Sequence, residues 1–313
     1  MACRRRVGAP VASAAVLQVL VDVLLPVFAV AMIGGVAGRW LGLEVRTLSR
    51  AVLFVFSPAL VFTSLSTVDI PAGDLAGVVG VTAAVFVIHT LAGLAWTRLR
   101  GTDRATESAA VLAASMGNQG NLGLPIASLA FGPAGFDVAV VVYVTGVVLW
   151  SSAGIAFASI GHASARRALL APLRYPSCYA AAAGAVVNAA GLDLPRSVQL
   201  PISTLAQAAI PTMLVVLGLQ FTVPKLVGLL DPAAIGVIRL VGGPLAALPL
   251  VALMGLSGVA ADTTVLLAGM PTAVMAIVVA GELKGRVDLV ARTVVLSTIA
   301  SGITLALWIT YLR

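Results

Sequence analysis

Charged residues are scarce in this 313-residue chain. Only 10% of the residues are Asp, Glu, Lys or Arg, and 60% are hydrophobic, whereas about 25% charged is usual in soluble domains. A water-soluble fold of this composition could not cover its own surface with polar side chains. The scarcity of charge therefore excludes a soluble globular protein and predicts an all-α integral membrane protein.

Cysteine and histidine are also rare, and the motifs of common catalytic sites are missing. Cys3 and Cys178 are isolated and lack metal-ligand spacing, so we expect no disulfide framework, no metal site and no cofactor. The sequence has no HExxH, GxSxG, paired-aspartate or Cys-His arrangement, which disfavours an enzyme with catalytic residues. The net charge of +7 is spread over short connections, so we expect no nucleic-acid partner.

Long stretches without any charged residue recur through the chain. Nine such stretches, and a tenth from Val7 to Gly38 interrupted only by Asp22, can each cross a bilayer once, since a spanning helix needs about 20 mostly apolar residues. We predict about ten transmembrane helices, at residues 17–39, 45–67, 75–98, 105–132, 136–160, 173–191, 197–220, 231–256, 262–282 and 288–312. The connections are too short for a separate soluble domain.

Basic residues are distributed unequally between the two sides of this predicted membrane protein. If successive loops face alternate sides, thirteen Lys and Arg residues lie on one side and five on the other. The positive-inside rule places the richer side in the cytoplasm and both termini outside, in a multi-pass protein of the plasma membrane. Residues 1–16 are expected to form a tail before the first span.

The chain divides near its middle at the predicted cytoplasmic connection 161–172. Five spans lie in residues 17–160 and five in residues 173–313, so the second half would enter the membrane from the opposite face. Such inverted five-helix repeats are the plan of many secondary transporters. Prolines support the repeat, because Pro58 and Pro125 recur as Pro211 and Pro271 at offsets of 153 and 146 residues. The alternative is coincidence, since proline is common in membrane helices.

The most polar stretch inside a predicted span is Met116–Pro125, MGNQGNLGLP, in which seven of ten residues are Gly, Asn, Gln or Pro. Pro125 cannot donate a hydrogen bond to the carbonyl of Asn121, and the glycines lower the cost of leaving helical geometry. We expect this helix to unwind here, and Gly269–Thr272 to form a thinner break in the ninth span. Unwound backbone at membrane depth is tolerated only where it is buried in protein or lines a wet cavity. Two such breaks predict a midplane binding site, with packing kinks as the alternative.

The direction of the two broken helices predicts the charge of the ligand. With the loops assigned as above, both half-helices that follow the breaks begin near the bilayer centre. Each N-terminus carries about half a positive charge and free N–H donors, which suits a carboxylate. The candidate substrate-binding residues are Asn118, Gln119, Asn121, Pro125, Pro271 and Thr272.

Three other features inside predicted spans leave alternatives open. Arg239 can reach the cytoplasmic interface, bond backbone carbonyls or contact an anion. For His89, packing with one satisfied ring nitrogen is favoured over a proton relay. Gly34 and Gly38 have the GxxxG spacing of close helix packing, within the chain or in a homodimer.

Met116 to Gly132, MGNQGNLGLPIASLAFG, resembles the fourth-span signature of the auxin efflux carrier family, whose bacterial members include presumed malate permeases. Leu48–Leu60, Arg239–Pro244 and Met270–Leu283 agree further, so the resemblance covers nearly the whole chain. It implies ten spans in two inverted repeats, with broken helices 4 and 9 crossing at a substrate site, and an elevator-like motion of a transport domain.

The resemblance also implies roles for single residues. Asn118 and Pro125 fall on the family's crossover positions in the fourth span, and Pro271 with Thr272 on those in the ninth. Glu282 matches a recurrent acidic position, so Glu282 and Arg239 are candidates for coupling or anion contact. Met275 departs from the family pattern, which has Asn in many bacterial members or Pro in plant members.

Together these observations predict a carrier that exports a small organic anion by alternating access across the lipid bilayer. Moving one negative charge outward down an inside-negative potential of 100 mV releases about 2.3 kcal/mol. Export would therefore not require a coupling ion, and coupling to protons or sodium stays open. A membrane-embedded enzyme, a channel or a sensor is the alternative.

Overall fold

The structure, a computed structural model, describes residues 9–154, 170–220 and 228–313. Within these ranges the regular elements are all helices, and the only β-type pairing is one isolated antiparallel bridge between Gly117 and Thr272. Residues 161–169 of the predicted connection and residues 1–8 of the predicted tail lie outside the described residues, whereas residues 9–16 begin the helix α1, Ala9–Val19.

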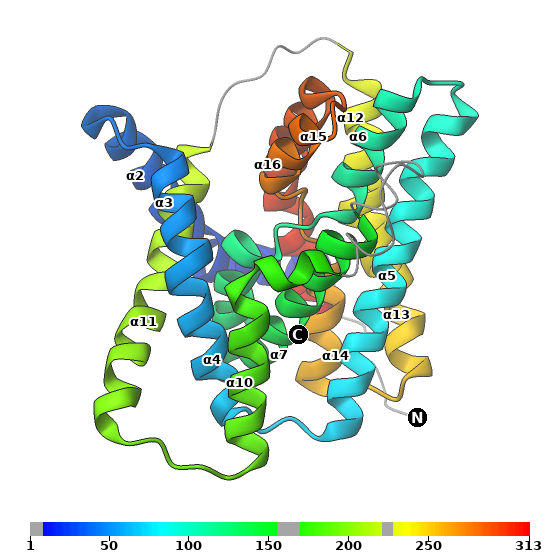
Figure 1. Ribbon diagram of the computed structural model, residues 1–313. Coiled ribbons are helices and arrows are strands. Elements are labelled where there is room, and N and C mark those ends of the chain that lie inside the picture. Colours follow the sequence, from blue (N-terminus) through cyan, green and yellow to red (C-terminus); the bar gives the residue numbers. More distant parts are fainter. Residues whose placement is uncertain (1–8, 155–169, 221–227) are drawn as a thin grey trace.

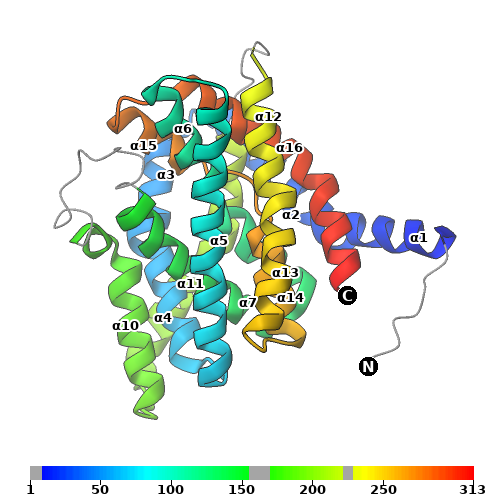
Figure 2. The ribbon, with the colours of Figure 1, turned by 90° about the vertical axis from the view of Figure 1, so that its right-hand side faces the viewer.

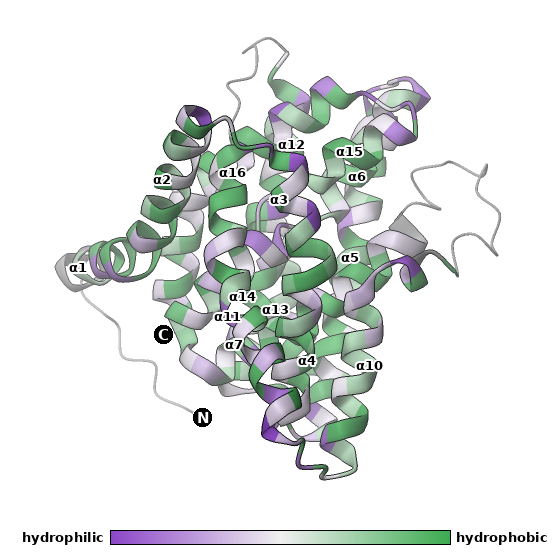
Figure 3. Cartoon of the chain, turned by 60° about the vertical axis from the view of Figure 1, so that its left-hand side comes forward, coloured by the Kyte–Doolittle hydropathy of each residue, from purple (hydrophilic) through white to green (hydrophobic). Residues whose placement is uncertain are grey.

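Among the described residues, seven helices are long and apolar enough to cross a membrane, which confirms a multi-pass helical membrane protein. They are Ala14–Leu41, Val45–Thr67, Ala72–Leu99, Gln119–Ser152, Arg196–Leu219, Leu230–Leu253 and Val287–Leu312. Large apolar side chains face outward along them; Ile33, Ile299 and Ile303 are each more than 60% exposed. Figure 3 shows hydrophobic colour along the sides of the helices, with much of the hydrophilic colour at their ends. This surface suits a lipid environment.

The count of seven is lower than the expected ten for identifiable reasons. The helix α10, Pro176–Ala189, has only 14 residues. The expected fourth and ninth spans are each interrupted, the ninth into α14, Gly258–Ala268, and α15, Met275–Glu282.

The expected fourth and fifth spans are not separated by a loop; they meet at a kink at Gly132, which lies at the predicted boundary between them. The helix α6, Arg104–Ser115, is followed by the π-helical turn η3, Gln119–Gly123, and by α7, Leu124–Leu149. Within α7 only Gly132 departs from helical geometry, with φ 69° and ψ −160°, a conformation that glycine adopts readily. Arg313 donates to the Ala130 carbonyl at 2.8 Å beside this kink, which supplies a partner where the helical bonding is interrupted.

Prolines explain four π-helical turns: η1 Leu20–Leu24, η2 Val52–Phe56, η3 and η6 Ile238–Gly242. Each turn ends two residues before a proline, because proline has no N–H to bond the carbonyl four residues earlier. The residue before the proline instead bonds the carbonyl five residues back, as Gly243 does to Ile238 before Pro244. The carbonyl freed by Pro244 belongs to Leu240, and it accepts a hydrogen bond from the indole of Trp308 at 3.0 Å.

The helices form two groups in space (Figures 1 and 2). The first, called the panel below, contains α2 (Leu25–Leu41), α4 (Ser57–Thr67), α10 and α11 (Arg196–Leu219), with α11 packed on α2 and α4, and α10 on α4. The second, called the crossover group, contains α5 (Ala72–Leu99), α6, α7, α12 (Leu230–Val237), α13 (Gly243–Leu253), α14, α15 and α16 (Val287–Leu312). The short helices α1, Ala9–Val19, and α3, Val45–Ala51, precede α2 and α4.

Small residues let α2 and α11 approach closely within the panel. A Cβ added at Gly34 would lie 2.6 Å from the Cα of Val215, and one at Gly38 would overlap Leu219. The GxxxG pair therefore packs within the chain, which is one of the two alternatives for that spacing.

Candidate functional site

The two interrupted helices meet at their interruptions, and this meeting place is called the crossover below. The Asn118 amide donates to the Pro271 carbonyl at 2.7 Å, and the Ala273 amide donates to the Met116 carbonyl at 2.8 Å. Each break thus supplies backbone partners that the other break lacks. Such mutual satisfaction is what non-helical backbone needs at membrane depth, because unpaired amides are costly there.

The first break is shorter than the sequence predicts. Only Met116–Asn118 is non-helical; Asn121 lies in the turn η3, where the Leu124 amide bonds the Gln119 carbonyl. The expected unwinding through Asn121 is wrong. Pro125 follows η3 by two residues, and this π-helical turn accommodates it, because the Leu124 amide bonds the Gln119 carbonyl and proline has no N–H of its own to place in the helix.

Thr272 connects the second break to the neighbouring helices α6 and α16 by hydrogen bonds. Its hydroxyl donates to the Ala113 carbonyl at 2.8 Å, and its amide donates to the hydroxyl of Ser297 at 3.1 Å. The side chain is completely buried. Thr272 therefore joins α15 to α6 and α16.

Arg239 lies at the centre of the crossover and is only 2% exposed. Its Nε donates to the Met270 carbonyl at 2.9 Å, and its Nη1 donates to the Ala114 carbonyl at 2.8 Å and contacts His89 Nδ1 at 3.2 Å. Of the roles left open for this residue, carbonyl bonding is the one observed, and the guanidinium does not reach an interface.

Two neighbours show how closely this arginine is held. A Cβ added at Gly117 would overlap the guanidinium, so only glycine leaves room for Arg239 at the first break. Since Arg239 Nη1 is a donor, His89 accepts at Nδ1 and must be neutral. The other ring nitrogen of His89 is buried and has no partner among the described residues, in agreement with the expectation of one satisfied nitrogen.

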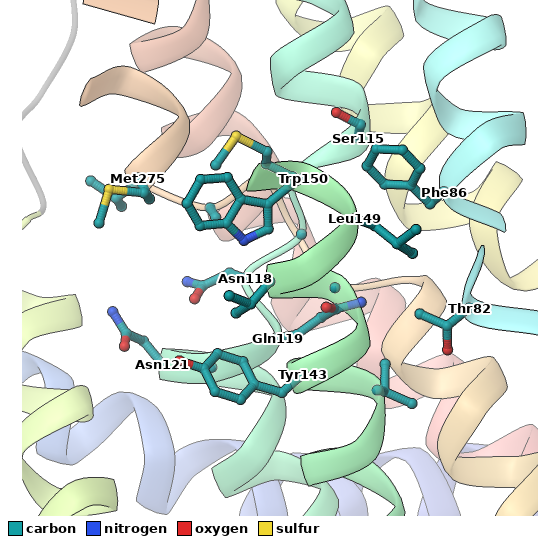
Figure 4. A pocket seen from close by; sticks show the side chains of 18 of the residues that line it. Thr82, Phe86, Ser115, Asn118, Gln119, Asn121, Tyr143, Leu149, Trp150 and Met275 are labelled. Atoms are coloured by element: carbon teal, nitrogen blue, oxygen red, sulfur yellow. The ribbon is translucent and has the colours of Figure 1, made fainter. Parts of the chain in front are cut away.

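A cavity of about 140 Å³ opens beside the first break, between the crossover and the panel. The panel contributes Val216 of α11, Gln220 directly after α11, and Ser57 of α4. In Figure 4 the second half of α7, drawn in green, lies between two sets of cavity-lining side chains. Asn118, Asn121, Tyr143, Trp150 and Met275 lie on one side of this helix in the view, and Gln119, Leu149, Phe86, Thr82 and Ser115 on the other.

Unpartnered polar atoms gather around this cavity. In the described part of the chain, eight buried side-chain nitrogen or oxygen atoms have no hydrogen-bond partner, and five of them belong to cavity-lining residues. The five are Ser49 Oγ, Ser57 Oγ, His89 Nε2, Asn118 Nδ2 and Gln220 Oε1. A buried polar atom without a partner costs about 1–3 kcal/mol, so such a concentration points to a place built to receive a polar guest.

Comparison with known proteins decides the class of the molecule. A protein family described as "Membrane transport protein" matches residues 19–309. The chain belongs to this transporter family. It is also 32% identical over 298 residues to an "Uncharacterized transporter" of Methanothermobacter thermautotrophicus, covering 94% of this chain and 96% of the relative. The family is one of transporters and not of enzymes.

The transporter brings together some of the predicted site residues and not others. Asn118, Gln119 and Asn121 line the cavity, whereas Pro125, Pro271 and Thr272 do not. The latter three are buried within the crossover instead.

Among the candidates for coupling or anion contact, Arg239 lines the cavity and Glu282 does not. Glu282 is exposed at the end of α15. The described lining contains no Asp or Glu, and no group of three or more His, Cys, Asp or Glu in the described residues could hold a metal ion.

Sequence reasoning missed the aromatic wall of the transporter's cavity. Tyr143 and Trp150 are seven residues apart, so they share one face of α7 and its continuation. Gly146 lies between them, and a Cβ there would overlap the amide of Gln119. The spacing of these three residues was the available signal, but aromatic residues at helical spacing are also common in ordinary packing.

Four helix ends meet at the crossover of the transporter, and they differ in whether a side chain compensates their partial charge. The negative C-terminal ends of α6 and α14 are occupied by Arg239, which bonds carbonyls at or just beyond both ends. The N-terminal ends of η3 and α15 line the cavity through Gln119 and Met275. A helix N-terminus acts as about half a positive charge, so two positive helix ends line the cavity. The charge of Arg239 compensates the negative C-terminal ends of α6 and α14.

Proposed function

We propose that this transporter is a carrier for small organic anions, with carboxylates as the substrate class. The observation that supports this most strongly is the charge arrangement at the crossover. Two positive helix ends line the cavity, Arg239 offsets the two negative ends, and the described lining contains no carboxylate that would compete with an anion. Helix N-termini bind anions through their free N–H groups and their dipoles.

In this proposal the amides of the first break bind the substrate. Asn118 is 5% exposed and its Nδ2 has no partner among the described residues, so it is available as a donor to a carboxylate oxygen. Gln119 and Asn121 provide further amide donors from the first turn of the half-helix. Pro125, Pro271 and Thr272 act indirectly, by shaping the half-helices that carry these donors.

The position of the cavity supports alternating access by an elevator-like motion. Its walls come from the panel on one side and from the crossover on the other. Movement of the crossover group against the panel would carry the site from one membrane face to the other. We infer ten crossings in two inverted repeats, with α10 and the two interrupted helices added to the uninterrupted spans. In this arrangement both chain termini lie on the outer side of the plasma membrane.

We further propose that the membrane potential assists export. An inside-negative potential of 100 mV favours outward movement of one negative charge by about 2.3 kcal/mol. Coupling to protons or sodium at Glu282 is the alternative. Glu282 is exposed at the end of α15 and does not line the cavity, which favours assistance by the membrane potential.

Thermal unfolding with matched ligand pairs tests the substrate class. Acetate, lactate, succinate and benzoate are compared with acetamide and benzamide, which have similar shapes to two of the acids but no charge. A ligand that binds only the folded protein raises its stability, so at least one carboxylate is expected to raise the midpoint while its amide does not. Equal shifts by acids and amides would contradict an anion site.

Transport into proteoliposomes then tests the mechanism. The carboxylate that gives the largest thermal shift is expected to move saturably, and faster when an imposed potential favours it. Flux that does not saturate would indicate a channel. Saturable flux that does not depend on the membrane potential and requires a sodium gradient would contradict potential-assisted export and indicate coupling to a cation.

A further inference from the structure

We propose that Arg239 is a positioning residue that locks the two interrupted helices into one unit and makes the crossover positive. This inference rests on the proposed function, because it explains why the cavity would accept an anion. Arg239 acts through the helix ends that it holds and does not itself bind the substrate.

The contacts of the guanidinium support the mechanical part of this role. One planar group reaches both interrupted helices, through the Met270 carbonyl beyond α14 and the Ala114 carbonyl near the end of α6. A second, longer contact of Nη1 to the Ser115 carbonyl at 3.4 Å adds to the hold on α6. A lysine ammonium is a point charge on a flexible stem, so it could supply the charge but not the fixed fork.

The charges around the crossover support the electrostatic part. Each helix end carries about half an elementary charge, so two N-termini and two C-termini would roughly cancel. Arg239 adds one full positive charge at the two negative ends. The balance is then about one positive charge, which a guest with one negative charge would neutralise.

Gly117 supplies an independent way to disturb this arrangement. A Cβ at position 117 would overlap the guanidinium, so Gly117→Ala must shift Arg239 without removing its charge. Arg313 provides the matched control, because it also donates to helix carbonyls at an interruption, those of Ala130 and Leu129, but does not line the cavity.

The test measures the local potential with charged thiol reagents and needs no substrate. Asn121→Cys is introduced into the full chain with Cys3→Ser and Cys178→Ser, and its reaction rates with an anionic and a cationic methanethiosulfonate reagent are compared. Removing one charge near the thiol in Arg239→Gln should lower the anionic-to-cationic rate ratio by about tenfold or more. Arg239→Lys and Arg313→Gln should leave the ratio within about threefold of the parent.

Hydrogen exchange of the same variants tests the mechanical part. The amides of Asn118 and Ala273, which pair the two breaks, should lose protection in Arg239→Gln and Gly117→Ala, and keep it in Arg313→Gln. Arg239→Lys should show intermediate protection with an unchanged rate ratio. If Arg239→Gln does not fold, Arg239→Met, which also lacks the charge, carries the rate-ratio measurement, and Gly117→Ala with Arg239→Lys carries the hydrogen-exchange measurement.

Two results would overturn the inference. A rate ratio that does not change in Arg239→Gln would remove the electrostatic role, and full protection of both amides in that variant and in Gly117→Ala would remove the mechanical one. Failure of the proposed function has a different signature: the parent protein would bind and transport no carboxylate, while the rate ratio would still respond to Arg239.

Discussion

The first break and the turn η3 that follows it present three amide side chains to the cavity, whereas the second break and the start of α15 present none. Asn118, Gln119 and Asn121 line the cavity from the first break, while the second contributes Ala273, Val274 and Met275. The polar group of the second break, the hydroxyl of Thr272, is directed to the Ala113 carbonyl. The two halves of the chain therefore contribute unequally to the site, with ligand chemistry from the first and support from the second.

The largest effect that would test this division is expected from Asn118→Ala. The side-chain amide has an unpartnered Nδ2, and the hydrogen bond to Pro271 is made by the backbone, so the fold should keep its stability. Transport efficiency should fall by about 10-fold to 150-fold, because a donor to a charged group is worth roughly 1.5–3 kcal/mol. Proteoliposome uptake and thermal unfolding measure the two quantities.

Asn188→Ala is the control for Asn118→Ala. Its amide donates to the Val68 carbonyl at 2.6 Å within the panel and does not line the cavity. This variant should lose stability and keep its substrate affinity. An Asn118→Ala variant with an unchanged ligand shift would remove Asn118 from the site.

Thr272→Val should show the opposite pattern, with a loss of stability as the main effect. The substitution keeps the shape but leaves the Ala113 carbonyl without its donor, which should cost about 1–3 kcal/mol of unfolding free energy. Thr298→Val is the matched control, since that hydroxyl donates within its own helix, to the Val294 carbonyl. A stable Thr272→Val with abolished ligand binding would place Thr272 in the binding site and contradict the division.

Met275→Asn should give a smaller change and make the two breaks more alike. Met275 lines the cavity at the start of α15 and is half-buried, so an amide there adds a donor to the second break. We expect affinity for the more polar carboxylates, lactate and succinate, to rise by about threefold to tenfold relative to benzoate, for one net hydrogen bond. An unchanged order of affinities in the thermal-shift panel would show that the second break does not contact the ligand.

The smallest effect concerns the start of α6, outside the cavity. The Asp103 carboxylate accepts a hydrogen bond from the Thr106 amide and caps this helix, and the hydrogen bonds with Thr106 lower the pKa of Asp103. A lowered pKa means that the carboxylate stabilises the folded state above about pH 4 and loses this contribution as the pH falls further. Asp103→Ala should therefore lower the unfolding midpoint slightly at pH 7, with a difference that shrinks as the pH falls below about 4. A difference that stays constant as the pH is lowered would contradict capping by the ionised carboxylate.

The sequence predicted the place of each break more reliably than its form. Amides next to glycine and proline in an apolar helix located Asn118 and its neighbours, because such residues have few other uses at membrane depth. The extent of the first break was wrong because a proline can be accommodated by one π-helical turn, as Pro125 is after η3. That choice depends on which neighbours accept the displaced backbone groups.

By itself the sequence determined a helical membrane transporter and the amides that face its cavity, since apolar length, charge distribution and local helix-breaking residues are properties of short segments. Only the tertiary structure decided that the two breaks pair with each other, that Arg239 joins them and that Gly117 makes room for it. Tyr143 and Trp150 became cavity walls in the same way. The hydrogen bonds between the two breaks and the bond of Arg239 to Ala114 join residues more than 100 positions apart. Their energy depends on distances and angles that no local pattern contains.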